Sequence, residues 1–307
     1  MKCRVCGQTA VIAIPRHNAA FCKDHFLEFF KNQVTRAIKE HGMFRKKDRI
    51  LVCVSGGKDS LVLWYVLTEL GYNTTGLYIN LGINDYSTTS KQKALKASEA
   101  LKRELIIKEF HLEYGSIKAV ARRGGRSDCS ACGTVKRHYF NKVAIDEGFD
   151  VVATGHNLDD EAARLLGNLL RWQWEYLGRV TPVLEEARGL KKKVKPLCRL
   201  TEHEIATYAF LKGIDYIVEE CPMSRHSTSL LYKEALNRIE LQSPGTKHYF
   251  YQEYLRTGRK VFQDRLGTPV GVCSSCGMPT TERECSFCRL ISRYLDSVKR
   301  PAATGSQ

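Results

Sequence analysis

Long hydrophobic runs are missing from this chain of 307 residues. No apolar stretch approaches the roughly 20 residues that a helix needs to cross a bilayer, so we expect no membrane contact. The opening residues, MKCRVCGQ, lack the apolar segment of a secretory signal peptide. Internal repeats are missing as well. These absences argue against a membrane or secreted protein and predict a cytoplasmic one, in which thiols stay reduced.

Acidic residues are in short supply relative to basic ones. Lys and Arg number 48 against 33 Asp and Glu, which gives a net charge of +15. The hydrophobic content of 43% is that of an ordinary globular protein. Basic side chains that neutralise phosphates release counterions, so a nucleic acid is the expected partner. A basic surface that is merely solvated is the alternative.

Strand-like and helix-like segments alternate from about residue 49 onward. The predicted strands are 49–55, 73–81, 106–112, 150–155 and 214–219. The predicted helices are 26–38, 60–70, 91–105, a helix after the central cysteines that ends near 147, 159–171 and 201–213, which opens with a capping box of Thr201 and Glu204. Residues 227–265 are basic and helical in pattern. The alternation predicts an α/β fold, a Rossmann-like parallel sheet with helices on both faces.

Twelve cysteines in a reducing compartment point to metals or catalysis rather than disulfides. Eight residues near the two ends form two sets of four ligands. The sets are Cys3, Cys6, Cys22 and His25, and Cys273, Cys276, Cys285 and Cys288. Four such ligands suit a closed tetrahedral zinc site, and modules this small depend on their metal for stability. Gly7 and Gly277 fit the tight turn after a second cysteine. An ordinary surface histidine is the alternative for His25.

Five cysteines remain, and three of them are candidates for one further site. Cys53 and Cys198 lie in apolar segments and are expected in the core. That leaves Cys129, Cys132 and Cys221. These three could meet, because Cys221 follows a predicted strand and the other two precede a helix that could start at the same sheet edge. Three thiolates suit an iron–sulfur cluster with one open iron, a catalytic zinc with a bound water, or a redox dithiol with a persulfide. Three unrelated cysteines are the remaining alternative.

The segment VCVSGGKDS, residues 52–60, predicts a phosphate-binding loop. A strand ends there, two glycines allow a tight turn, and backbone N–H groups at the following helix start form an anion site. Lys58 adds a positive charge, and Ser55 and Ser60 add hydroxyls. The loop is not a Walker A motif, because Val52 and Asp59 stand where that motif needs Gly and Ser or Thr.

A second segment, TGHNLDDEA at residues 154–162, also follows a strand and opens a helix. Gly155 would let the backbone approach a nucleotide. Asp159 and Asp160 would hold Mg²⁺ or orient phosphates, unless they only complement the helix N-terminus.

The SGGKDS loop resembles the PP-loop of ATP pyrophosphatases. Taken with CSACGTVKR (129–137), TGHNLDDEA, VKPL (194–197), EECP (219–222) and the two terminal knuckles, the chain resembles the tRNA 2-thiouridine synthetases of the TtuA type over about residues 1–290. These belong to the TtcA/TtuA group, whose cytidine-thiolating TtcA branch lacks paired terminal zinc modules. His138 departs from the pattern, since Tyr is common there.

The resemblance implies a set of cofactors and site residues. A [4Fe–4S] cluster would sit on Cys129, Cys132 and Cys221, with its fourth iron free to carry sulfide. Lys136, Asp160 and Asp59 fall on catalytic positions of the family, beside two Zn²⁺ and Mg²⁺. ATP would lie on Val54, Ser55, Gly56, Gly57, Lys58, Asp59, Ser60 and Gly155.

The implied reaction is ATP-dependent adenylation of the uridine C2 oxygen in tRNA, followed by sulfur transfer that gives 2-thiouridine. Position 54 is favoured and wobble position 34 is the alternative. Sulfur would come from a ubiquitin-like carrier with a C-terminal thiocarboxylate or from another sulfide donor; whether a homodimer forms is left open. The zinc modules would grip tRNA together with Lys233, Arg238, Arg256, Arg259 and Lys260.

Two other functions compete with this one. Another PP-loop enzyme, such as a lysidine synthase, an NAD-synthetase-like amidase or a GMP-synthetase-like protein, would share the nucleotide loop but need no three-cysteine centre. A zinc-bearing RNA-binding protein would lack catalysis altogether. The predicted organisation is a zinc finger at 1–25, a catalytic domain at 26–226, a basic helical region at 227–268, a second zinc finger at 269–290 and a tail at 291–307. Within the tail, PAATGSQ (301–307) is expected to be disordered.

Overall fold

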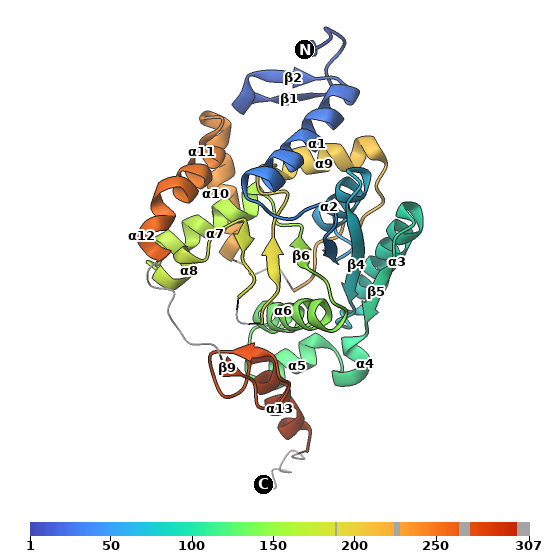
Figure 1. The fold of residues 1–307 in the computed structure, drawn as a ribbon, viewed down its shortest axis with the longest axis vertical. Helices are drawn as coiled ribbons and strands as arrows, with labels where there is room; N and C mark the ends of the chain where they lie inside the picture. The colour runs from blue at the N-terminus through green and yellow to red at the C-terminus, as the bar shows by residue number, and fades with distance from the viewer. Residues whose placement is uncertain (188, 224–227, 264–270, 300–307) are drawn as a thin grey trace, which may run out of the picture.

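A six-stranded sheet forms the centre of the computed structural model, which describes residues 1–187, 189–223, 228–263 and 271–299 (Figure 1). Its strand order is β5-β4-β3-β6-β8-β7. The strands are β3 (Arg49–Val54), β4 (Asn73–Ile79), β5 (Leu105–Lys108), β6 (Val151–Thr154), β7 (Val183–Leu184) and β8 (Lys192–Val194). All neighbours pair in parallel except β7, which runs antiparallel to β8. The order reverses between β3 and β6, and α/β proteins bind ligands at such a point.

Alternate side chains of β3 enter two separate cores, because successive residues of a strand point to opposite faces. Ile50 and Val52 join the core under α1 (Lys23–Glu40), α2 (Lys58–Glu69), α7 (Leu158–Leu170) and α9 (Glu202–Lys212). Leu51 and Cys53 join the core under α4 (Phe110–Tyr114), α5 (Ile117–Arg123), α6 (Asp128–Asp146) and α13 (Ser286–Lys299). The predicted α/β fold with both faces covered is confirmed. None of the described helices is both long and apolar enough for a membrane span.

Small modules lie at the two ends of the chain, far apart in Figure 1. The N-terminal module has a hairpin of β1 (Ile12–Ile14) and β2 (Ala19–Phe21), joined by a 3₁₀ turn at Pro15–His17. Helices α10 (Thr228–Gln242), α11 (Thr246–Glu253) and α12 (Arg259–Gln263) form the predicted basic region, with a π-helical turn at Tyr254–Gly258. The C-terminal module pairs β9 (Gly271–Val272) with β10 (Pro279–Thr280) and continues into α13, which runs past residue 290 to Lys299. Residues 301–307 of the predicted tail lie outside the described residues.

Several predicted elements differ from the observed ones. The predicted strand 214–219 is wrong, because only one parallel bridge, Gly57 to Ile217, forms there. The segment 106–112 is split between β5 and α4, and α3 (Asn84–Leu101) starts seven residues before the predicted helix at 91. Strand β8 was not predicted. The capping box of α9 is confirmed, since the Glu204 N–H donates to Thr201 Oγ1 (3.3 Å) and the Thr201 N–H donates to Glu204 Oε2 (2.8 Å).

Candidate active site and metal centres

The PP-loop is a tight turn between β3 and α2, held by its own hydroxyls. The Ser55 N–H donates to Ser60 Oγ (3.0 Å), and the Ser60 hydroxyl donates to the Gly57 carbonyl (2.9 Å). Gly56 has φ +77° and lies against α3, where a Cβ would stand 2.4 Å from the Ser90 carbonyl oxygen. Gly57 caps α2 with no side-chain hydrogen bond to the first turn. These first-turn amides therefore suit an anion such as a phosphate.

Gly155 packs against the PP-loop itself. A Cβ at this position would lie 2.9 Å from the carbonyl carbon of Asp59 and 2.9 Å from the Ser60 nitrogen. The sequence predicted that this glycine lets the backbone approach a nucleotide, and the close approach in the structure is to the loop. Asn157 adds a second link, because its Nδ2 donates to Asp59 Oδ1 (3.2 Å). Lys58 Nζ also lies 2.7 Å from that carboxylate oxygen.

Asp159 lies in the interior and not in a magnesium site. Its side chain is 3% exposed and accepts hydrogen bonds from Lys247 Nζ (2.5 Å) and from the Glu202 N–H (2.8 Å). The prediction that Asp159 holds Mg²⁺ is therefore at odds with its position: the carboxylate ties α7 to α11. A buried charge that loses its partner costs about 3–5 kcal/mol, so the pair has a structural role.

Asp160 points to the basic helical region. Its Oδ2 accepts from the Asn157 N–H (3.1 Å), which completes a capping box for α7, and its Oδ1 lies 2.5 Å from Lys233 Nζ. Burial raises the pKa of Asp160. The Lys233 charge and the hydrogen bond from the Asn157 N–H lower it by more, so the net shift is downward. Lys233 also pairs with Glu202 and is 17% exposed. It was predicted to contact tRNA, which stays a prediction; in the structure it makes these two ion pairs.

Lys195 of the VKPL segment is likewise buried. Its Nζ donates to Glu161 Oε2 (2.7 Å) and to the Thr181 carbonyl (3.0 Å). Burial lowers the pKa of Lys195 to about 8 despite the adjacent Glu161 carboxylate. The VKPL segment therefore anchors β8 to α7.

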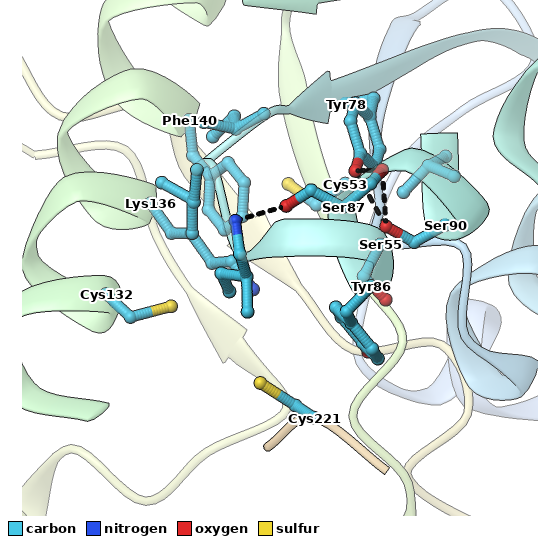
Figure 2. Close-up of a pocket in the computed structure, with 14 residues that line it drawn as sticks. Cys53, Ser55, Tyr78, Tyr86, Ser87, Ser90, Cys132, Lys136, Phe140 and Cys221 are labelled. Carbon is cyan, nitrogen blue, oxygen red and sulfur yellow. Dashed lines mark hydrogen bonds between the residues drawn. The ribbon is translucent and has the colours of Figure 1, made fainter. Parts of the chain in front are cut away.

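Two of the three central cysteines open into one cavity beside the PP-loop. Cys129 and Cys132 lie in the first turns of α6, three residues apart and therefore on one helix face. The sequence placed them before the helix rather than in it. Figure 2 shows the sulfur atoms of Cys132 and Cys221 directed into the same space. The cavity measures about 160 Å³, and its lining residues are Cys53, Val54, Ser55, Tyr78, Ile79, Leu81, Ile83, Tyr86, Ser87, Ser90, Cys132, Lys136, Phe140 and Cys221.

Backbone contacts bring Cys221 to this place although no strand precedes it. The Ile217 N–H donates to the Gly56 carbonyl (3.0 Å), which ties the segment to the PP-loop. The Cys129 thiol donates to the Met223 carbonyl (3.1 Å), two residues beyond Cys221. Burial raises the pKa of Cys129, and the charges of Cys132 and Cys221 raise it further, so the three sulfurs interact electrostatically.

Helix α3 supplies cavity residues that no sequence motif revealed. Burial raises the pKa of Tyr86 to about 12, with Cys221, Tyr78 and Cys132 adding to the shift. Tyr78 donates to the Ser87 carbonyl (2.9 Å) and lies 2.7 Å from Ser90 Oγ. The run YSTTS at 86–90 has small polar residues at helical spacing, and this was the signal available in the sequence.

The terminal cysteines form two compact groups. In each, one ligand atom per residue lies within 4.8 Å of all the others: Cys3, Cys6, Cys22 and His25, and Cys273, Cys276, Cys285 and Cys288. Tetrahedral zinc with bonds of about 2.3 Å to sulfur separates the sulfurs by roughly 3.8 Å. The Sγ atoms of Cys6 and Cys22 are 3.7 Å apart, and so are those of Cys276 and Cys285. Each group therefore fits one zinc ion of its own. Among the described residues, the central three form no such compact group.

Local electrostatics lower the thiol pKa of some cysteines in each group and raise that of others, such as Cys6 and Cys276. Desolvation raises the pKa of Cys3, but backbone N–H groups of Cys22, Cys6 and Val5 lower it to about 6 overall. The same balance brings the pKa of Cys273 to about 6. Thiolates are the form that binds metal. Gly7 (φ +74°) and Gly277 (φ +71°) adopt the left-handed turn that was predicted for them.

Comparisons with known proteins agree with this arrangement. Residues 2–27 match the family described as 2-thiouridine synthetase TtuA, N-terminal LIM domain, and residues 26–228 match the PP-loop domain. A Thermus thermophilus protein named tRNA-5-methyluridine(54) 2-sulfurtransferase is 46% identical over 295 residues, which cover 94% of this chain and 91% of the relative. This chain belongs to the TtuA family of tRNA 2-thiouridine synthetases. The resemblance found in the sequence is confirmed.

Two further relatives bear on the family's substrates. A Pyrococcus horikoshii TtuA-type protein of the same name is 44% identical over 293 residues, 94% of this chain and 93% of the relative. The solved structure of the U34-tRNA thiolase NcsA from Methanococcus maripaludis, with its [4Fe-4S] cluster, is 27% identical. Its TM-score is 0.78, with 95% of this chain and 96% of that chain covered.

Proposed function

We propose that this protein is an ATP-dependent tRNA-uridine 2-sulfurtransferase that makes 2-thiouridine at position 54 of tRNA. The observation that carries the proposal is the shared cavity: the thiols of Cys132 and Cys221 open into the space that the PP-loop residues Val54 and Ser55 line. A sulfur site and a nucleotide site would then meet at one substrate atom. Relatives that are 40–46% identical carry the name tRNA-5-methyluridine(54) 2-sulfurtransferase, which favours position 54.

The central cysteines suit a cluster better than a single ion. Two of the three thiols, those of Cys132 and Cys221, border a cavity, and among the described residues no histidine or carboxylate joins the three in a compact group. Cys129, Cys132 and Cys221 would hold a [4Fe–4S] cluster. When bound, a cluster with three cysteine ligands supplies one iron that can bind an external sulfide. The solved structure of the 27% identical thiolase NcsA contains a [4Fe-4S] cluster.

The residues around the cavity would activate the uridine. The C2 oxygen is a poor leaving group, so it first attacks the α-phosphate of ATP and pyrophosphate departs. The PP-loop amides and Lys58 stabilise the charge on the departing pyrophosphate. Sulfide then adds at C2, and the adenylated oxygen leaves as AMP. Lys136 lines the same cavity and would neutralise the α-phosphate.

The residues that would hold Mg²⁺ and zinc are those whose side chains are accessible or lie close together. Asp59 and Asp160 would be the carboxylates that hold Mg²⁺, because Asp159 is buried, and the ion would neutralise phosphate charge. Each compact terminal group would hold one zinc. The sulfur donor would be a carrier protein with a C-terminal thiocarboxylate or free sulfide. A cytoplasmic location follows from the substrate tRNA.

Anaerobic assay of the reconstituted protein tests the proposal. The mixture contains ATP, sulfide and a tRNA transcript, and the readout is mass spectrometry of nuclease fragments. We expect one sulfur at position 54 and one AMP per thiolated tRNA. A transcript with C54 is the matched control and should remain unmodified. Sulfur at position 34 would replace the proposed target, and AMP release without any thionucleoside would overturn the sulfurtransferase assignment.

A further inference from the structure

Two exposed tryptophans form a stack where the turn after α7 leads into α8 (Trp174–Gly178). Trp172 is 62% exposed and Trp174 is 39% exposed. Their ring centroids lie 5.6 Å apart, with 26° between the planes. The chain has three tryptophans, and the third, Trp64, is completely buried. Large aromatic side chains usually lie in the core, so an exposed pair needs an explanation outside folding.

The backbone at Trp172 makes the pair more unusual. Helix α7 ends with the Gln173 N–H donating to the Asn168 carbonyl (3.0 Å) and the Trp172 N–H donating to the Leu169 carbonyl (3.1 Å). This is a Schellman motif, in which the residue at the Trp172 position is left-handed and commonly glycine. Trp172 has φ +47°, a strained conformation for a bulky residue. Strain of this kind is concentrated at functional sites, and the exposed ring gains little burial in return.

Two exposed arginines and one exposed glutamate, Glu175, lie in the segment that carries the pair. Arg171 and Arg179 flank it and are exposed. The Phe262 ring lies 5.2 Å from the Trp174 ring, so the basic region packs against the same spot. Tyr176 is 58% exposed and adds another aromatic side chain to this surface. Aromatic faces beside cationic side chains are the features with which proteins bind unpaired RNA bases and their phosphates.

We propose that Trp172 and Trp174 form a platform on which an unpaired base of the tRNA stacks. The inference rests on the proposed function. An enzyme that reacts at a base atom must take the base out of its stack, which leaves adjoining bases without a partner. The tryptophan platform supplies a replacement partner, and Arg171 and Arg179 neutralise the adjoining phosphates. RNA is favoured over a second copy of this chain because flanking arginines would repel their own copies across a symmetric contact.

Intrinsic tryptophan fluorescence tests the platform directly. Titration with a folded tRNA is expected to quench the emission, since both exposed tryptophans lie in the platform. A perfectly paired RNA duplex of equal length should bind through its phosphates and quench little. The variant with Trp172→Phe and Trp174→Phe keeps two stacking rings and only the Trp64 signal. It should bind tRNA nearly as tightly as the wild type but show no quenching.

Affinity measurements separate stacking from charge. Trp172→Ala is expected to weaken tRNA binding roughly tenfold with an unchanged salt dependence, because stacking releases no counterions. Arg171→Gln should instead lower the slope of log K against log salt by about 1. Phe210→Ala is the matched control, since Phe210 is an 83% exposed aromatic on α9, and its affinity should equal that of the wild type.

Three outcomes would overturn the platform. They are equal quenching by duplex RNA, unchanged tRNA affinity in Trp172→Ala, and a concentration-dependent dimer that Trp172→Ala dissociates. The last would assign the surface to a second copy. Thiolation by the wild type is measured in parallel, so that failure of the platform with normal thiolation leaves the proposed function standing. Absence of thiolation in a wild type whose tryptophans are quenched would remove the function and keep the RNA site.

Discussion

The Sγ atoms of Cys6 and Cys22 in the N-terminal module are 3.7 Å apart, and so are those of Cys276 and Cys285 in the C-terminal module. Two of the central cysteines, Cys132 and Cys221, border a cavity instead, and among the described residues the central three form no compact group. The terminal groups are built from short local turns. The central group joins the start of α6 to a segment that is held by the PP-loop. Cysteine side chains therefore form both compact four-ligand groups and the more open central group, and the backbone that positions them determines which kind of group forms.

The two terminal modules differ from each other in what they pack against. Residues of the N-terminal hairpin, such as Ile12 and Ile14, belong to the core under α1 and α9. Residues of the C-terminal module, such as Cys285 and Phe287, belong to the core that also holds Ala131 and Val135 of α6. The C-terminal module therefore supports the helix that carries Cys129 and Cys132, and the N-terminal module does not.

Cys221→Ser should have the largest effect on this comparison. It removes one ligand of the open site, so we expect loss of iron and a drop in thiolation of at least about a thousandfold, while both zinc ions remain. Metal analysis of anaerobically prepared protein and the thiolation assay measure this. Cys198→Ala is the matched control, because Cys198 is fully buried and burial raises its pKa to about 12. That variant should keep all metals, and retention of iron by Cys221→Ser would contradict the open site.

Cys285→Ser and Cys6→Ser compare the two closed groups. Each should lose one zinc and, with it, several kcal/mol that stabilise its own module. Because α13 packs on α5 and α6, Cys285→Ser should also release iron several times faster than the wild type. Cys6→Ser should release iron at the wild-type rate. Iron chelation followed by absorbance gives both rates, and equal rates in the two variants would show that the modules do not differ in this way.

His138→Tyr should give the smallest effect, through pH. The His138 ring stacks on Phe287, with centroids 3.8 Å apart, and burial lowers its pKa to about 4. Its pKa in the unfolded chain is near 6.5, so the unfolded state binds the proton more strongly. Stability is therefore intact above pH 6.5 and falls as the pH drops toward 4, by at most about 3 kcal/mol because the ring is partly exposed.

The measurement is the unfolding temperature of both proteins between pH 7 and pH 4. Acid also protonates the cysteine ligands, so the difference between the two curves carries the result. Tyrosine keeps an aromatic ring against Phe287 but does not gain a proton in this range. We expect acid to lower the unfolding temperature of the wild type more than that of His138→Tyr. If the two curves of unfolding temperature against pH run parallel, His138 does not contribute to the acid sensitivity.

Local features of this protein were predictable from sequence. The C-x₂-C spacings, Gly7 and the capping box of α9 depend on residues a few positions apart, so their geometry follows from backbone rules. The SGGKDS loop was placed correctly for the same reason, because a strand, two glycines and a helix start follow one another directly.

Features that depend on tertiary contacts were not predictable. The alternating run 214–219 looks like a strand, yet Ile217 makes only one bridge, to Gly57. Asp159 and Asp160 are adjacent and chemically equal, but Lys247 engages one in the interior and Lys233 engages the other. No sequence pattern indicates which lysine from a distant helix will meet which carboxylate.

The contacts of Gly56 mean that the PP-loop is not a portable part. Ser90 closes one side of Gly56, and on the other side the Gly56 carbonyl accepts a hydrogen bond from the Ile217 N–H. Residues 52–60 grafted into a different protein would keep the sequence of the motif but lose Ser90 and Ile217, the two neighbours that fix the position of Gly56. To keep the conformation of the loop in another protein, α3 and the segment that leads to Cys221 would have to be transferred with it.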